Sequence, residues 1–288
     1  MKPYAHTTSK LVSISLIAIM ALVAPGGKIA EAHANGASAF GPADPFPARA
    51  ANALTGSEFL ARTSTMNAAE REQAIMAEIT AGNVPDHIRA LVPVELSYGE
   101  HRATIFVVPD YLAIGANEDY VIIPMMPRTA MHIAREFGYT LPTRKMVDDI
   151  HHGSSVQLTP VPMHPGGGMT SNAYYEEHDC RIKLQLPPQS GEPALIAGHK
   201  KDVVLTPRLL RQPDRVAIYG WHYPSGRRIQ PLSLVHEVDY VDYSHGARLI
   251  SRLAIVDGEP VDLAMVFGDK QLSPLVSDEG AVPIQSYL

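Results

Sequence analysis

Residues 194–251 read ALIAGHKKDVVLTPRLLRQPDRVAIYGWHYPSGRRIQPLSLVHEVDYVDYSHGARLIS. Short apolar runs rich in Val, Ile and Tyr alternate in this stretch with turn residues such as Pro224 and Gly226, and this pattern predicts β-strands. Polar side chains fall at the ends of these runs, where neighbouring strands can bring them to one place. They are four histidines and three aspartates: His199, Asp202, His222, His236, Asp239, Asp242 and His245.

The rest of the chain is more helical towards its beginning. Asn67 and Glu70 form a capping-box pattern at the start of the first helical segment. Because helices come early and strands cluster late, the predicted fold class is α+β, with a helical N-terminal part packed against a mainly antiparallel C-terminal β-sheet. Helices are expected over 67–81, 129–137, 143–150 and 171–186, and strands over 94–98, 103–108, 111–114, 120–125, 156–162, 203–206, 216–221, 247–256 and 261–266.

Composition divides the chain into four parts. We expect a signal peptide over 1–34 and a linker rich in Ala, Gly, Pro, Ser and Thr over 35–66, with a short helix around 57–62. An N-terminal α+β subdomain is expected over 67–162. A β-rich domain that carries the site is expected over 163–288.

The first residues have the pattern of an export signal. Lys2 and Lys10 supply positive charge, residues 11–24 are apolar, and Ala-x-Ala cleavage sites follow at 32–34 and 37–39. The apolar run is shorter than the about 20 residues that a membrane span needs. We therefore expect a periplasmic or secreted protein with no stable membrane span after signal removal. The alternative is an uncleaved N-terminal anchor.

Charge and cysteine content exclude several classes of protein. The formal net charge of −6, without any basic block, argues against a nucleic-acid partner. Cys180 is the only cysteine in the sequence, so no intramolecular disulfide can form. Carboxylates beside Cys180 disfavour a thiolate, and we expect a buried structural cysteine rather than a nucleophile.

Four residues form the expected catalytic set. His199 and Asp202 suit a general base oriented by a carboxylate, or two metal ligands, and the alternative is a turn whose charges face water. His222 and His245 are expected to act as acid or as ligand. We expect at least two of the three histidines to lie within hydrogen-bond or shared-ligand reach. Zinc is a possible cofactor, but the sequence lacks a compact ligand motif such as His-Glu-x-x-His, so a metal-free site is favoured.

Aromatic side chains near these histidines are the expected substrate-binding residues. Trp221 beside His222 would stack against a sugar ring or line a cleft, and the alternative is an aromatic plug at the end of a sheet. Tyr174, Tyr243 and His236 are the other candidates for substrate binding.

Residues 236–245 follow the pattern His-x-x-Asp-x-x-Asp-x-x-His. On a helix, spacings of three would gather these side chains on one side. On a strand, His236 and Asp239 would lie on opposite faces. Valines recur with the same period, as in an ordinary amphipathic segment. We therefore expect one or two of the four residues in a site rather than all four together.

The dipeptides Asp148-Asp149 and His151-His152 have two interpretations. Tandem histidines after tandem aspartates can bind a metal. They can also end a helix, because the helix dipole favours histidine near the C-terminus. We favour the helix end and leave these residues out of the expected site.

The turn Ser244-His245-Gly246 leads into Ala247-Arg248. It resembles the Ser-His-Gly-Cys-x-Arg signature of the L,D-transpeptidases, which cross-link peptidoglycan, over a handful of residues with His236 upstream. Ala247 stands where that family has its nucleophilic cysteine, and the arginine comes one residue early. Because acyl transfer in the family needs the thiolate, the resemblance implies no role for these residues.

Two functions are compatible with these patterns. The first is an exported hydrolase or lyase that acts on a cell-envelope or extracellular polymer through a His/Asp site. The second is a non-catalytic secreted protein that binds carbohydrate or the envelope through its aromatic residues. Truncating His199 should abolish turnover under the first hypothesis, and altering Trp221 should abolish binding under the second.

The export pattern makes a direct prediction. A positively charged start, an apolar run and small residues at the cleavage site are what a signal peptidase recognises, so the chain should be cut before residue 40. Intact-mass analysis of protein recovered from the periplasm or the culture fluid measures the cut. A cytosolic product that retains Met1 would contradict the prediction.

Overall fold

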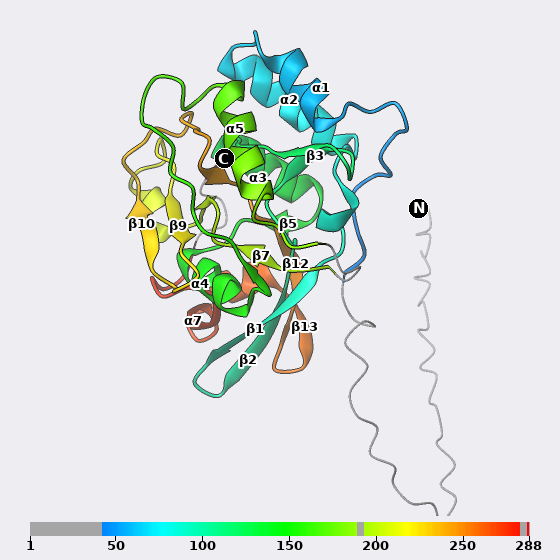
Figure 1. Cartoon of the computed structure of the whole chain (residues 1–288). Helices are drawn as coiled ribbons and strands as arrows, with labels where there is room; N and C mark the ends of the chain where they lie inside the picture. The colour runs from blue at the N-terminus through cyan, green and yellow to red at the C-terminus, as the bar shows by residue number, and fades with distance from the viewer. Residues whose placement is uncertain (1–41, 189–192, 283–286, 288) are drawn as a thin grey trace, which may run out of the picture. The chain divides into compact units, whose positions relative to one another are not determined.

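The computed structural model describes residues 42–188, 193–282 and 287 (Figure 1). The expected signal peptide and the first part of the expected linker lie outside the described residues. The described residues belong to one compact unit. Helices occupy much of its N-terminal part and antiparallel strands its C-terminal part, which is the α+β class expected from the sequence.

Two capped helices begin this unit. They are α1 (Gly56–Thr63) and α2 (Ala68–Thr80). Each starts on a reciprocal capping box, in which the cap side chain accepts a bond from the helix backbone and the Glu58 or Glu70 carboxylate accepts one from the backbone N–H of the cap residue. The short helix expected within the linker is therefore α1.

The larger sheet is antiparallel and draws on both halves of the chain. Its strands run in the order β1-β2-β12-β13, and β5 pairs with β12. Because β12 also pairs with β2, the expected segments 67–162 and 163–288 share this sheet. The strands are β1 (Val92–Tyr98), β2 (His101–Val107), β5 (Tyr139–Thr140), β12 (Ile250–Val256) and β13 (Glu259–Asp262).

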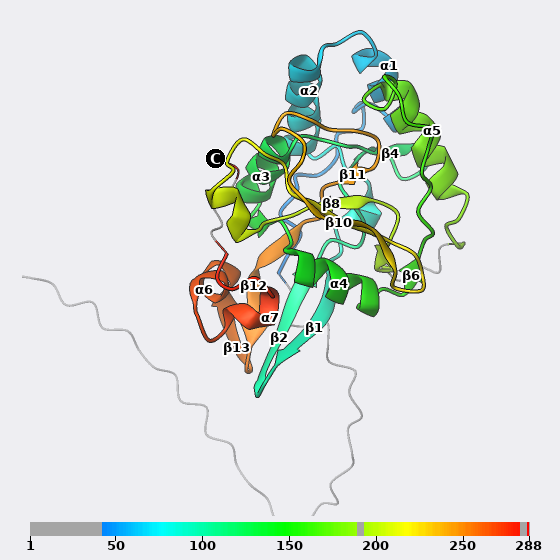
Figure 2. The same cartoon turned by 90° about the vertical axis from the view of Figure 1, so that its left-hand side faces the viewer.

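The smaller sheet (Figure 2) carries three of the polar residues identified from the sequence, which are Asp202, His222 and His245. Its order is β10-β9-β8-β11, and all its pairs are antiparallel except β8 with β11. His245 lies opposite Lys201 in that parallel pair. The strands are β8 (Lys201–Val203), β9 (Ile218–His222), β10 (Arg228–Ser233) and β11 (His245–Gly246).

The remaining elements connect and cover the two sheets. Helix α4 contacts β9 of the smaller sheet and β1 of the larger one. The elements outside the two sheets, after α1 and α2, are η1 (Asp86–Ile88), β3 (Ala113–Gly115), β4 (Tyr120–Ile122), α3 (Pro127–Glu136), α4 (Arg144–Gly153), β6 (Val156–Gln157), α5 (Asn172–Lys183), β7 (Ile196–Ala197), η2 (Pro207–Leu210), α6 (Leu263–Gly268) and α7 (Ser273–Val276).

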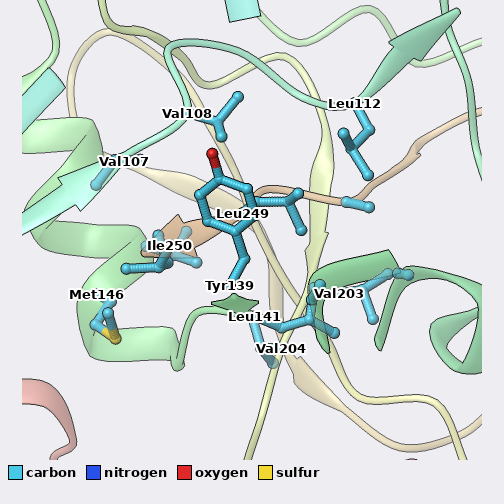
Figure 3. Close-up of a cluster of buried hydrophobic side chains, with 14 of the residues drawn as sticks. Val107, Val108, Leu112, Tyr139, Leu141, Met146, Val203, Val204, Leu249 and Ile250 are labelled. Carbon is cyan, nitrogen blue, oxygen red and sulfur yellow. The ribbon is translucent and has the colours of Figure 1, made fainter. Parts of the chain in front are cut away.

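The apolar core lies where the two sheets approach each other (Figure 3). Val107 and Ile250 come from the larger sheet, Val203 from the smaller one, and Met146 from α4, and all four are buried. Burying side chains of this size stabilises the fold by roughly 1.5–3 kcal/mol each. Within the described ranges, no helix is long and apolar enough to cross a bilayer.

Several sequence-based expectations were wrong. Residues 261–266 do not form one strand, because β13 ends at Asp262, whose side chain caps α6. The strand expected over 156–162 is limited to β6, which ends at Gln157. Residues 236–245, for which both a helix and a strand were considered, form no helix, and only the last of them belongs to a strand, β11. Cys180 is exposed on α5 rather than buried, because the buried face of that helix is formed by other residues.

Gly246 gives a test of the packing between β11 and β8. A Cβ atom at this position would lie 2.5 Å from Tyr111 Cδ1 and 2.8 Å from Lys200 Cβ, and both neighbours are buried. Gly246→Ala should therefore lower the free energy of unfolding by about 1–3 kcal/mol. Gly167→Ala is the control, because nothing lies within 4 Å of its added carbon. Equal stability of the two variants in chemical denaturation would contradict the packing described here.

Candidate functional site

A cluster of buried polar side chains surrounds strand β8, and we call it the polar core. Its members come from α5, from β8 with the residues just before it, and from β11 with the turn that precedes it. Charged groups are rarely buried unless they are paired, so each member needs a partner. The members, all buried, are His178, His199, Lys200, Asp202, Asp242 and His245.

Lys200 is the cation at the centre of the polar core. Its Nζ donates to the Tyr243 carbonyl oxygen at 2.7 Å and lies 3.2 Å from His178 Nδ1. Burial lowers the pKa of Lys200 to about 8, and aspartates led by Asp179 oppose that shift. The ammonium therefore remains mostly charged at neutral pH. The same burial and the Lys200 charge lower the pKa of His178, which keeps that imidazole neutral.

His199 lies against Asp110 rather than Asp202. Its Nε2 is 3.1 Å from Asp110 Oδ1, but the two groups are not aligned for a hydrogen bond. Neither ring nitrogen of His199 has a hydrogen-bond partner among the described residues. Burial would raise the pKa of Asp110, but the nearby His199 lowers it on balance. The carbonyl of His199 accepts a bond from Trp221 Nε1 at 3.1 Å.

Asp202 has a different set of partners. Tyr111 donates its hydroxyl to Asp202 Oδ2 at 2.9 Å, and Arg248 Nε lies 3.8 Å from Oδ1. Burial raises the pKa of Asp202 to about 6, and Arg248 opposes the shift. The Tyr111 ring also contacts the His199 ring edge-on, with 4.9 Å between centroids. The expected direct pairing of His199 with Asp202 is thus replaced by contacts of both residues with Tyr111.

His245 is fully buried beside Asp242. Burial lowers the pKa of His245 to about 4, and neither of its ring nitrogens has a hydrogen-bond partner among the described residues. Asp242 accepts bonds from the Ser244 hydroxyl at 2.5 Å and from the Tyr240 hydroxyl at 3.0 Å. Ser244 is therefore held by the carboxylate rather than by an imidazole.

The other two members of the His-x-x-Asp-x-x-Asp-x-x-His pattern lie apart from this pair. His236 stacks on Tyr240 with 4.1 Å between ring centroids. Asp239 is exposed and lines shallow hollows on both sides of Tyr240. Two of the four residues, Asp242 and His245, thus belong to one buried cluster. Because residues 236–245 form no helix, their spacing of three does not bring all four side chains to one side.

The expected substrate-binding aromatics pack against one another. Tyr243 lies 5.9 Å from Tyr174 and 6.4 Å from Trp221 between ring centroids. Trp221 and Tyr243 are buried, and the Tyr243 hydroxyl accepts a bond from the Met163 amide. This arrangement is the aromatic plug at the end of a sheet and not an open sugar platform. Trp221 also has a φ of 57°, a left-handed conformation that is strained for so large a residue.

His222 belongs to a second polar cluster, which we call the His222 cluster. It comprises His222 and Tyr219 from β9 together with Asp148 and His151 from α4. His222 Nε2 lies 2.9 Å from Asp148 Oδ1, and the Tyr219 hydroxyl lies 2.9 and 2.8 Å from the two oxygens of that carboxylate. The His151 ring stacks on His222 with 4.7 Å between centroids.

Local structure explains this geometry. Helix α4 begins on a Thr143 cap, and residues three apart on a helix share one side, so Asp148 and His151 both face β9. Asp148 was left out of the expected site because the Asp-Asp-Ile-His-His segment is also a normal helix end. The sequence carries no signal that would pair it with a histidine 74 residues away.

The charges in the His222 cluster suit acid–base chemistry. Burial would raise the pKa of Asp148, but hydrogen bonds from His222 and Tyr219 lower it on balance, so the carboxylate is ionised at neutral pH. Burial, then the charge of His222, lowers the pKa of His151 to about 4, which leaves that ring neutral. Burial and the bond to Asp148 raise the pKa of Tyr219, which stays protonated.

The three expected catalytic histidines therefore have three different neighbouring carboxylates. His199 lies against Asp110, His222 against Asp148, and His245 beside Asp242. In the part of the chain that the structure describes, no three His, Cys, Asp or Glu side chains are gathered as they would be around a metal ion. A mostly apolar hollow of about 510 Å³ lies elsewhere, next to η1 and β4, and is lined by residues that include His87 and Tyr120.

Comparison with known proteins adds nothing to this geometry. No protein-family model, no curated protein and no solved structure matches the chain. The functional interpretation therefore depends on the residues and contacts described above.

Asp202 gives a test of the polar core through pH. Its pKa of about 6 in the folded protein exceeds the ordinary 3.8, so the folded state holds this proton more tightly and loses stability as pH rises from 4 to 6. Asp202→Asn removes that titration. The free energy of unfolding of the variant, relative to wild type, should increase by up to roughly 3 kcal/mol over this range.

Chemical denaturation of both proteins at several pH values between 4 and 7 measures the difference. Histidine titrations are common to both proteins and cancel in the comparison. Stability curves that stay parallel across the range would contradict the raised pKa of Asp202.

Proposed function

We propose that this protein is a hydrolase or lyase that acts on a cell-envelope or extracellular polymer, with His222 as its acid–base residue and Asp148 as the carboxylate that orients it. The observation that carries the proposal is the 2.9 Å contact between His222 Nε2 and an Asp148 side chain that is 42% exposed. The polymeric, extracytoplasmic substrate rests on the export pattern of the first 34 residues.

Exposure of the carboxylate distinguishes this pair from the buried His–Asp contacts, because the Asp148 side chain is 42% exposed although the His222 side chain is 4% exposed. The side chains of His199 and Asp110 are 0% and 1% exposed, so a polymer cannot reach them without a rearrangement. His101 and Asp257 are exposed, but they join two hairpins of the larger sheet, and neither a tyrosine nor a second histidine bonds them among the described residues. The His222 cluster combines an accessible carboxylate with a tyrosine and a second imidazole.

The contacts support one arrangement of the protons. An ionised carboxylate only accepts hydrogen bonds, so in a neutral His222 the ring proton lies on Nε2, which donates a hydrogen bond to Asp148. Nδ1 then holds the lone pair and acts as the base. It takes a proton from an attacking water in a hydrolase, or from a substrate carbon in a lyase, and Asp148 stabilises the imidazolium that forms.

The alternative function, a non-catalytic binding protein, has less support. It relied on Trp221 and Tyr243 as an exposed aromatic platform, and both side chains are buried. Tyr223 is partly exposed, but its ring lies beneath the Arg227 guanidinium, 4.4 Å from its centre.

The proposal predicts the effect of two substitutions on turnover. The purified protein should release soluble fragments from one of a panel of envelope polymers and polysaccharides. His222→Asn should lower kcat/KM by roughly 10²–10⁴-fold, because the base is lost. Asp148→Asn should lower it by roughly 10²-fold or more, because an amide no longer fixes the ring tautomer. His101→Asn is the matched control and should leave the rate unchanged.

Two further measurements complete this experiment. Ultraviolet absorption by a new carbon–carbon double bond in the product identifies a lyase, and its absence identifies a hydrolase. Dialysis against EDTA separates a metal-free site from a zinc-assisted one. Full activity of both cluster variants, with native circular dichroism, would contradict the proposed role of His222.

A further inference from the structure

We propose that Arg228 binds a carboxylate of the substrate, so that the polymer cleaved at the His222 cluster is an acidic one. This inference rests on the proposed function of that cluster and adds the chemical class of the substrate.

The position of Arg228 is set by the hairpin of β9 and β10. Arg228 lies directly opposite His222 in this antiparallel pair. Side chains of directly opposed residues project from the same face of a sheet. The Arg228 guanidinium also stacks on the Tyr219 ring, with 5.4 Å from its central carbon to the ring centre. Tyr219 in turn bonds Asp148, so the cation lies beside the reaction centre.

Arg228 is exposed and forms no ion pair with a carboxylate among the described residues, although Asp148 lies near it. The charge of Arg228 helps to lower the pKa of Asp148. The oxygens of Asp148, however, bond His222 and Tyr219 rather than Arg228. The neighbouring Arg144 differs in this respect, because it pairs with Asp278 at 2.8 Å. The N–H groups of Arg228 are therefore available to an external anion.

The chemistry of this group selects a carboxylate. A guanidinium is planar and presents paired donors that match the two oxygens of a carboxylate. Stacking on Tyr219 holds the plane in place, which reduces the entropy lost on binding. The whole protein carries a net charge of −6 and repels polyanions at long range. A local cation is thus needed if an acidic chain is to lie beside the ionised Asp148.

Carboxylates of this kind occur on uronic-acid rings and on peptide stems, and both would meet the same donors. The experiment therefore uses oligogalacturonate, the same oligomer with its carboxyl groups reduced to alcohols, and poly-γ-glutamate. Binding is measured by calorimetry with full-length His222→Asn protein, so that turnover does not interfere.

The acidic oligomer of the preferred source should bind at least about tenfold more tightly than the reduced oligomer. Arg228→Gln should remove that difference, and Arg228→Lys should restore only part of it. Arg227→Gln is the matched control, because this neighbour is also exposed and stacks on a different ring, Tyr223. In active protein, Arg228→Gln should raise KM more than it lowers kcat.

The inference would be overturned if neither acidic probe bound more tightly than the reduced oligomer. An equal effect of Arg227→Gln would also overturn it, because it would indicate general charge attraction. Turnover of a neutral polymer that needs His222 but not Arg228 would reject the acidic substrate and keep the proposed function. Arg228-dependent binding without any His222-dependent turnover would reject the proposed function and keep Arg228 as a carboxylate-binding residue.

Discussion

Lys200 places a positive charge inside the protein with no exposure to solvent, and the surrounding architecture balances that charge. An unpaired buried ion costs several kcal/mol, so it must be compensated by nearby groups. The Tyr243 carbonyl and the Asp179, Asp242 and Asp110 carboxylates supply that compensation. These groups come from distant parts of the chain, and the fold that unites them also brings β11 alongside β8.

This arrangement separates two kinds of histidine. His199 precedes Lys200 in the sequence, His245 lies opposite Lys201 in the sheet, and both histidines are buried. His222 lies at the end of β9, where α4 brings a partly exposed carboxylate to it. His199 and His245 thus lie inside the polar core, whereas the His222 cluster includes a carboxylate that solvent reaches.

Local signals in the sequence were sufficient for much of the fold. The Asn67 capping box was predicted correctly, and the strands expected over 94–98 and 103–108 are found as β1 and β2, because these features depend on residues close together in the chain. The site was predicted only in part. His222 was identified from its place at a strand end, but its partner Asp148 lies 74 residues away in the sequence. Asp110, which contacts His199, is also distant from it in the sequence. Such pairings are set by tertiary packing, and no local pattern encodes them.

The central claim is that Asp148 orients His222 as a base, and the tautomer of that imidazole tests it most directly. Long-range ¹H–¹⁵N correlation spectra of the folded protein, assigned with His222→Asn, report which ring nitrogen carries the proton. The account predicts a neutral His222 protonated on Nε2, with a strongly deshielded proton that shifts in Asp148→Asn. A ring protonated on Nδ1, or a spectrum unchanged by that substitution, would contradict it.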